Sequence, residues 1–164
     1  MKNIFKIIVL ILSLSTFVLA SAVEDIDINN KIKLAKQQNK HLMIFFHIPR
    51  CPYCKSMLNE NFKDKEILAH IKKNFILIDL YTADDTFISY GDFDGNIKEF
   101  ATHIGAFASP ATVFINIDKK VVFKSIGYRD TQGLLAEMKY VATKSYDTIP
   151  FKEYKEKLEF ESDD

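Results

Sequence analysis

Apolar residues occur along this chain in two patterns, which predict two kinds of secondary structure. Some form short continuous runs, typical of strands buried on both faces, and others recur every three or four residues, as on one face of a helix. The runs predict strands over 41–47, 75–80, 111–117 and 121–126, and the spaced positions predict helices over 27–38, 52–58, 65–73, 97–104, 130–141 and 151–160. This alternation predicts an α/β fold, with a mixed central sheet of four or five strands flanked by helices and its first two strands parallel.

Several predicted helices carry start signals. Asp64 and Asp130 are expected N-caps, because an Asp side chain accepts hydrogen bonds from the free N–H groups of the first turn. Pro52 falls in the first turn of its helix, where its missing N–H costs nothing. The inner face of the helix over 65–73 is expected to consist of Ile67, Leu68 and Ile71.

The last predicted helix is an extra C-terminal helix beyond the elements of the sheet. It is short and highly charged, and one apolar stripe along it is expected to contain Phe151, Tyr154, Leu158 and Phe160. We expect this stripe to pack against the body of the domain.

The segment over 81–96 shows neither pattern and is rich in Asp and Gly. Its run from Asp92 to Gly95 is similar to the start of a calcium-binding loop, but the later glutamate that such a loop requires is absent at that spacing. The segment is therefore predicted to consist of solvated turns.

The start of the chain has the features of a secretory signal. Lys2 and Lys6 precede an apolar run over 7–19, and the small residues of a cleavage site follow at Ala20-Ser21-Ala22. The run is short for a membrane span, so we expect 1–22 to be a cleaved signal peptide and 23–164 to be one domain in the periplasm. An uncleaved membrane anchor is the alternative.

The charge of the chain is balanced, with 22 basic and 22 acidic residues among 164. Removal of the leader takes away two lysines and no acid, which leaves a net charge of −2. The protein therefore lacks the positive charge with which proteins bind nucleic acid or anionic lipid. A hydrophobic content of 48% is sufficient for one ordinary core.

The only two cysteines, Cys51 and Cys54, stand where the predicted strand over 41–47 gives way to a helix. Free backbone N–H groups and the helix dipole favour a thiolate at such a position. Cys54 lies one turn further along, where it can attack a mixed disulfide formed by Cys51. The arrangement predicts a redox-active dithiol that needs no other cofactor.

Other roles for the cysteine pair fit less well. A structural disulfide would close so small a loop that it restricts the unfolded chain little. A structural zinc site needs four ligands, and the chain has no second cysteine pair. His47 and His103 could at most supplement the first pair, so no metal site is predicted. Attachment of a c-type haem needs a histidine directly after the second cysteine, where this chain has Lys55.

Residues around the pair are candidates for supporting roles. The positive charges of Arg50, His47 and Lys55 are expected to stabilise the thiolate, although ordinary surface placement is the alternative for such residues. Pro52 and Tyr53, between the cysteines, are expected to contact the substrate.

The run Cys51-Pro52-Tyr53-Cys54, the later pair Ser109-Pro110, a closing hairpin and a final helix together resemble the thioredoxin superfamily. Within it the chain is most similar, over 30–141, to exported SoxW-type thioredoxin-like proteins. Glutaredoxins share the four active-site residues, but the leader, the first helix and the segment after Leu80 argue against a small glutathione-binding domain.

The resemblance implies a thioredoxin-like fold and roles for individual residues. By it, Cys51 is the attacking thiolate, Cys54 is the resolving thiol and Pro110 is a cis-proline that faces them. A cis bond turns the backbone of Ser109 toward the dithiol, where it can pair with an extended substrate strand. Gly127 falls where the family keeps a small residue beside this groove, although a glycine that merely ends a strand would look the same.

One departure from the family pattern is expected to affect the chemistry. Thioredoxins often keep a buried acid six residues before the first cysteine and a lysine on the neighbouring strand, and this chain has Phe45 and Leu77 at those positions. We therefore expect water or the departing substrate thiol to take the proton of Cys54.

The resemblance further implies a periplasmic thiol:disulfide oxidoreductase that reduces disulfides of exported proteins and receives electrons from a membrane donor. The protein is expected to be a monomer with no nucleic-acid partner. The alternatives are a disulfide oxidant of the DsbA type and a binding or chaperone module of the same fold without redox turnover.

Overall fold

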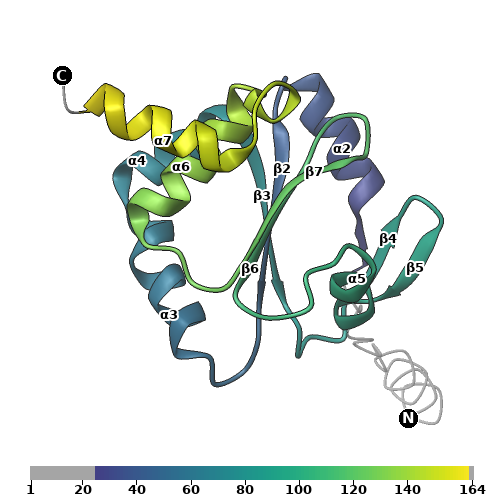
Figure 1. The fold of residues 1–164 in the computed structure, drawn as a ribbon. Helices are drawn as coiled ribbons and strands as arrows, with labels where there is room; N and C mark the ends of the chain where they lie inside the picture. Colours follow the sequence, from purple (N-terminus) through teal and green to yellow (C-terminus); the bar gives the residue numbers. More distant parts are fainter. Residues whose placement is uncertain (1–24, 163–164) are drawn as a thin grey trace, which may run out of the picture.

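A computed structural model describes residues 25–162 of the chain. The central sheet has four strands in the order β3-β2-β6-β7, in which β2 runs parallel to β3 and antiparallel to β6, and β6 runs antiparallel to β7 (Figure 1). Their bounds are β2 His41–His47, β3 Phe75–Tyr81, β6 Ala111–Ile115 and β7 Val121–Ile126. The predicted mixed sheet and the parallel pairing of its first two strands are confirmed.

Helices cover both faces of this sheet (Figure 1). One face is covered by α3, α4 and α6, with α7 packed outside α6, and the other face is covered by α2 and α5. The helices are α2 Ile28–Gln37, α3 Pro52–Asn59, α4 Lys65–Asn74, α5 Ile97–His103, α6 Thr131–Ala142 and α7 Phe151–Ser162, with short 3-10 helices at Asn61–Lys63 and Ser145–Asp147.

Strand β2 contributes to two separate cores, which explains its continuous apolar run. Alternate side chains of a strand point to opposite faces, so Leu42, Ile44 and Phe46 pack on the α2 and α5 side. Met43 and Phe45 pack on the side of α3, α4 and α6. Both faces of β2 are therefore dry, and its carboxyl end emerges between two helical layers.

The helix starts agree with their predicted caps. Asp64 accepts hydrogen bonds from the backbone N–H groups of Glu66 and Ile67 at 2.8 and 3.0 Å, and Asp130 accepts one from Gly133 at 2.7 Å. Each such cap stabilises its helix by about 1 kcal/mol.

The segment over 81–96 is not the set of solvated turns that its composition predicted. It contains strands β4 (Phe87–Tyr90) and β5 (Phe93–Asn96), which form a hairpin, and β4 also pairs in parallel with the short strand β1 (Ile26–Asp27). Ile88 in this small sheet is fully buried. The prediction was wrong because strand β4, which carries Ile88, is only four residues long and one of its two partner strands, β1, is far away in sequence.

Gly95 has a specific role in this hairpin. It pairs with Ile88, and a Cβ atom at its position would come within 2.8 Å of the Phe93 ring and 2.7 Å of the Glu99 carboxylate. The glycine that suggested a turn thus lies inside a strand, where a larger residue would displace the Phe93 ring and the Glu99 carboxylate.

Three expected placements were also wrong. Leu68 is 47% exposed, because Ile67 and Ile71 are one turn apart on the inner face of α4 and Leu68 points away from it. Phe160 is 78% exposed, since it lies more than half a turn around α7 from Leu158. Strand β6 stops at Ile115 rather than residue 117, because the Asn116 side chain accepts hydrogen bonds from the backbone of the following turn.

The predicted leader, residues 1–22, lies outside the described residues. Within 25–162, none of the helices combines the length and the apolar content that crossing a membrane requires.

Candidate functional site

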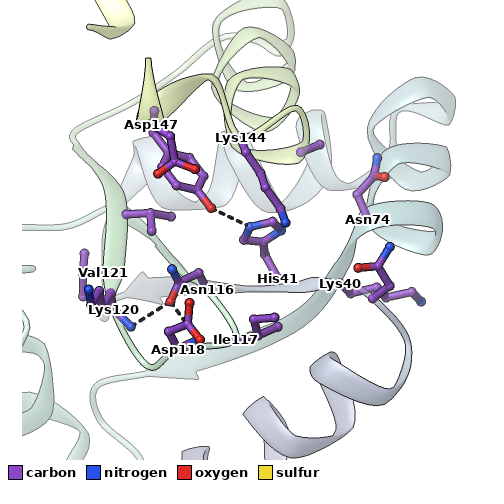
Figure 2. Close-up of a pocket in the computed structure, with 14 residues that line it drawn as sticks. Lys40, His41, Asn74, Asn116, Ile117, Asp118, Lys120, Val121, Lys144 and Asp147 are labelled. Atoms are coloured by element: carbon purple, nitrogen blue, oxygen red, sulfur yellow. Dashed lines mark hydrogen bonds between the residues drawn. The ribbon is translucent and has the colours of Figure 1, made fainter. Parts of the chain in front are cut away.

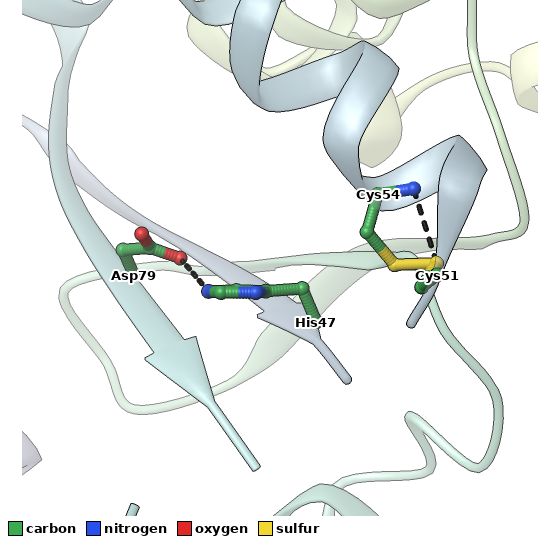
Figure 3. The surroundings of a disulfide bond; sticks show 4 residues. All are labelled: His47, Cys51, Cys54 and Asp79. Atoms are coloured by element: carbon green, nitrogen blue, oxygen red, sulfur yellow. Dashed lines mark hydrogen bonds and ion pairs between the residues drawn. A yellow bond between two sulfur atoms is a disulfide. The ribbon is translucent and has the colours of Figure 1, made fainter. Parts of the chain in front are cut away.

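The two cysteines form a disulfide at the start of α3, directly after the carboxyl end of β2 (Figure 3). Cys51 is the N-cap residue of the helix, and its sulfur accepts a hydrogen bond from the backbone N–H of Cys54 at 3.0 Å. Pro52 follows at the first helical position, where no N–H is needed. A sulfur in this place faces the positive end of the helix dipole, which stabilises a thiolate there once the bond is reduced.

The two sulfurs differ in accessibility. Cys51 is partly exposed, whereas Cys54 is only 2% exposed. A disulfide of another protein can therefore approach the sulfur of Cys51 and not that of Cys54. This asymmetry is what stepwise thiol–disulfide exchange requires, because one thiol must meet the substrate and the other must be held behind it.

An open cleft lies beside the disulfide on the β3 side of the site. Its walls include Cys51, Cys54 and the three residues that were expected to influence the thiolate: His47, Arg50 and Lys55. Arg50 and Lys55 are exposed, and Arg50 has a left-handed backbone conformation with φ of 56°. The structure thus places these three side chains and the dithiol around the same cleft.

His47 has a partner that the sequence did not reveal. Its Nε2 lies 3.0 Å from Oδ1 of Asp79 on β3, and the His47 side chain is only 15% exposed (Figure 3). Partial burial raises the pKa of Asp79 above its ordinary value, the charge and hydrogen bond of His47 act against that rise, and the charge of Asp84 adds to it.

The sequence contains one sign of this pair, a charged residue inside an otherwise apolar strand. Asp79 interrupts the apolar run of β3, and the parallel register places it directly opposite Phe45, the position where thioredoxins often keep an acid. The position of the missing acid is thus occupied by Phe45, but two titratable side chains lie near it. Asp79 is opposite Phe45 on the adjacent strand, and His47 is two residues further along β2.

The other predicted substrate contacts lie on the β6 side of the dithiol. The peptide bond between Ser109 and Pro110 is cis, and β6 begins at Ala111, which pairs with Phe46 near the end of β2. Gly127 has φ of 94° and donates its N–H to the carbonyl of Pro110 at 2.8 Å. The register thus places the cis-proline at the same edge of the sheet as the dithiol.

An aromatic pair extends this side of the site. Tyr53, between the cysteines, is 64% exposed, and its ring centroid lies 5.7 Å from that of Tyr128, which directly follows Gly127. Tyr128 was not among the residues singled out in the sequence. Two exposed aromatic rings in contact with each other, one of them next to Cys51 in the chain, form an apolar surface that an unfolded segment can contact.

A buried ionic network holds the loop that carries Tyr128. Glu137 on α6 is fully buried and accepts hydrogen bonds from Arg129 Nε at 2.6 Å and from the Ser125 hydroxyl at 2.8 Å. The Asn61 side-chain amide donates to the carbonyl of Arg129 at 2.8 Å. Burial raises the pKa of Glu137, while Ser125 and Arg129 act against that rise. Periodicity did not reveal this network, since it joins three distant segments.

A second cavity, of about 450 Å³, lies at the opposite end of β2 and contains no cysteine (Figure 2). His41 lines it and approaches the hydroxyl of Tyr146, with 3.1 Å between Nε2 and Oη. Burial and the charge of Lys144 lower the pKa of His41, and Asp147 acts against that change. Among the residues that the structure describes, no group of three or more His, Cys, Asp or Glu side chains is arranged to hold a metal ion.

The four-stranded mixed sheet, the disulfide-bonded Cys-X-X-Cys pair at a helix start and the cis-proline at the adjacent strand define an α/β protein of the thioredoxin type. The chain belongs to the thioredoxin-like domain family, whose sequence profile matches residues 28–142. That range runs from α2 to the end of α6, so α7 is an addition to the family domain.

Solved structures share this fold at low sequence identity. A thioredoxin-fold protein from Helicobacter pylori has a TM-score of 0.61 and 18% identity, over 76% of this chain and 85% of that chain. A disulphide isomerase from Xylella fastidiosa Temecula1 has a TM-score of 0.53 and 21% identity, over 70% and 87%. The C-terminal domain of DsbD from Neisseria meningitidis, in its oxidised form, has a TM-score of 0.51 and 14% identity, over 67% and 88%. No curated protein matches the chain.

Proposed function

We propose that this protein is a periplasmic thiol:disulfide oxidoreductase that reduces disulfides of exported proteins through a mixed disulfide on Cys51. The observation that carries the proposal is the Cys51–Cys54 pair at the start of α3, with one reachable sulfur and one buried sulfur. Membership of the thioredoxin-like domain family supports the same class of reaction.

The reaction proceeds in two exchanges. In the reduced protein the Cys51 thiolate attacks one sulfur of a substrate disulfide, and the other substrate sulfur leaves as a thiolate that takes up a proton. Cys54 then loses its proton and attacks the Cys51 sulfur, which closes the Cys51–Cys54 disulfide and releases the second substrate thiol. Two electrons pass from the dithiol to the substrate disulfide. Cys51 starts as a thiolate, so one of the two protons on the substrate thiols comes from Cys54 and the other from solvent.

The surroundings of Cys51 support its role as the attacking group. The N–H of Cys54 points at its sulfur, and the positive charges of Arg50 and Lys55 lie in the same cleft. Each of these favours the thiolate over the thiol. They also favour Cys51 as the leaving group when a donor reduces the protein again.

Substrate recognition is assigned to the β6 side of the dithiol. An extended segment of the substrate pairs with the backbone of Ser109, next to Pro110, while its side chains contact Tyr53 and Pro52 and pass close to Gly127. Backbone pairing of this kind is tolerant of sequence, which suits a protein that acts on several substrates.

The reducing direction is favoured by the resemblance to SoxW-type proteins. In that direction an electron donor in the membrane regenerates the dithiol, and the expected leader, residues 1–22, exports the protein to the compartment where its substrates fold. The protein acts as a monomer, because an exposed Cys51 next to an open groove needs no second copy.

The exchange is tested with two single-sulfur variants. Purified protein is incubated with insulin and a small thiol reductant, and reduction is followed by the precipitation of the insulin B chain. The unmodified protein is expected to accelerate this precipitation. Cys51→Ser is expected to abolish the acceleration, because no thiolate remains at the exposed position. Cys54→Ser, reduced beforehand and mixed with insulin without the small reductant, is expected to accumulate a covalent complex that added reductant releases. Full activity in Cys51→Ser would instead favour a binding module of the same fold.

The direction is tested by the equilibrium between this protein and glutathione. A reduction potential near the thioredoxin value of about −270 mV is expected for a reductant. A value near about −120 mV, as in DsbA, would assign the oxidising role instead.

A further inference from the structure

The ion pair between His47 and Asp79 lies beside the dithiol and has no part in the two exchanges of the proposed function. We propose that His47, held by Asp79, accepts the proton of Cys54 when Cys54 resolves the mixed disulfide. The inference rests on the proposed exchange and names the group that takes the proton of Cys54 before Cys54 attacks the mixed disulfide.

The position of Cys54 creates the need for such a group. Its side chain is 2% exposed, so bulk water has little access to the thiol that must ionise. His47 and Cys54 line the same cleft, and in Figure 3 the His47 ring reaches toward Asp79, with the disulfide on the other side of the ring. Water in this cleft can therefore carry a proton from the sulfur to the ring.

The imidazole is held in one orientation. Its ring stacks on Phe45, with ring centroids 5.7 Å apart, and on Tyr81, with centroids 4.8 Å apart. The Nε2–Asp79 contact of 3.0 Å makes Nε2–H the donor in a neutral ring, which leaves the lone pair on Nδ1 as the proton acceptor. When the ring gains a proton, the carboxylate stabilises the imidazolium.

Charged and titratable groups surround His47 on each element that borders the cleft. Strand β3 and the loop after it contribute acids and a phenol, whereas the loop before α3 and α3 itself contribute cations and the two sulfurs. These groups are Asp79, Tyr81 and Asp84 on the first side, and Arg50, Cys51, Cys54 and Lys55 on the second. Protonation of His47 therefore places the new positive charge next to Asp79 on β3.

The proton transfer and the disulfide exchange together conserve bonds, protons and electrons. The S–H bond of Cys54 breaks and an N–H bond forms on His47, and the Cys54 thiolate attacks the Cys51 sulfur of the mixed disulfide. A new sulfur–sulfur bond joins Cys51 and Cys54 while the substrate sulfur leaves with its electron pair. His47 then returns its proton to the departing thiolate or to solvent, so no further reductant or oxidant is needed.

The inference is tested by stopped-flow reaction of the fully reduced protein with Ellman's reagent. Attack by Cys51 releases a first equivalent of coloured nitrothiobenzoate, and attack by Cys54 releases a second. This leaving group needs no proton, so the second phase reports the ionisation and attack of Cys54. The first phase tests the proposed function and the second tests the role of His47.

In His47→Gln the second phase is expected to slow at least about tenfold near neutral pH, while the first changes less than about twofold. The deficit is expected to vanish near about pH 10, where Cys54 ionises without help. Asp79→Asn, which keeps the ring but removes the charge of its partner, is expected to give a smaller slowing with the same pH dependence.

His103→Gln is the matched control, since it removes an exposed imidazole on α5 outside the cleft. It is expected to leave both phases unchanged.

A second phase that is equally fast in His47→Gln and in the unmodified protein at every pH would overturn the inference, as would a deficit that persists at high pH. A slowed first phase with an unchanged second phase would overturn it too, and would assign His47 to the thiolate of Cys51. Loss of the first phase in the unmodified protein would instead reject the proposed function.

Discussion

Individual side chains in this protein carry charge in places where solvent is scarce. Glu137 is fully buried beneath the loop that carries Tyr128, and Arg129 supplies the compensating positive charge at 2.6 Å. A buried charge is tolerated only when a partner and hydrogen bonds satisfy it. The loop beside the dithiol is therefore held by an ion pair that cannot lose one member without cost.

Replacement of Arg129 by Met is expected to lower the free energy of unfolding by about 3 kcal/mol near neutral pH, the lower end for such pairs because Arg129 is partly exposed. Burial already raises the pKa of Glu137, and removal of Arg129 raises it further. A carboxyl group whose folded pKa exceeds its unfolded value destabilises the native state as the pH rises above the unfolded value. The deficit is thus expected to be smaller at about pH 5 than at about pH 7, as measured by urea unfolding.

The control for this substitution is the double variant Arg129→Met with Glu137→Gln. It removes both charges and is expected to regain part of the lost stability at neutral pH, since no unpaired carboxylate remains. A loss of equal size at both pH values would show that packing rather than charge explains the effect.

His41, at the opposite end of β2 from the dithiol, gives a second prediction at this scale. Burial and Lys144 lower its pKa, so the unfolded chain binds a proton more readily than the native state. Stability is therefore expected to fall as the pH drops below the unfolded value of about 6.5. His41→Gln is expected to weaken this dependence between about pH 7 and about pH 5, as urea midpoints would measure. An identical pH dependence in the variant would contradict the assignment.

At the scale of elements, α7 is attached to the family domain through a few aromatic contacts. The ring of Phe151 lies 4.8 Å from Phe123 and 5.2 Å from Tyr140, and Tyr154 lies 5.1 Å from Tyr140. The far end of the helix makes no such contact through Phe160, which is 78% exposed. The first turns of α7 therefore account for its docking.

Phe151→Ala is expected to lower the free energy of unfolding by about 2 kcal/mol, less than for a fully buried phenylalanine because the side chain is partly exposed. Phe160→Ala on the same helix is the matched control and is expected to change stability by less than about 0.5 kcal/mol. Thermal unfolding followed by circular dichroism measures both. Similar losses in the two variants would contradict the proposed docking surface.

At the scale of the whole molecule, one sheet joins two cores. Strands β2 and β6 contribute alternate side chains to both of them, so neither core can open while the strand pairing stays intact. A domain built in this way is expected to unfold in one cooperative step.

The cooperativity is tested by weakening each core separately. Phe100→Leu acts on the α2 and α5 side, and Phe114→Leu acts on the side of α3, α4 and α6. Each is expected to cost about 1.5 kcal/mol and to shift the whole transition. Midpoints from circular dichroism and from tyrosine fluorescence are expected to coincide in both variants. Separate midpoints would show that the two halves unfold independently.

Elements that depend on local pattern were predicted closely. Strand β2 and helices α2, α3 and α6 were found within a residue or two of their predicted bounds, because apolar spacing and caps such as Asp130 act over a few residues. The hairpin of β4 and β5 was missed, since its short strands are stabilised by β1 and by the burial of Ile88 rather than by a pattern of their own.

The sequence by itself determined the dithiol and its place between a strand and a helix, because both depend on residues that are near neighbours in the chain. It also determined the thioredoxin-like fold, through the order of the predicted elements and the resemblance carried by Cys51–Cys54 and Ser109-Pro110. The tertiary structure decided which charges meet. His47 and Asp79 face each other through the parallel register of β2 and β3, and Glu137 reaches Arg129 through the packing of α6 under the last strand. Contacts between distant segments depend on register and packing, which no local pattern encodes.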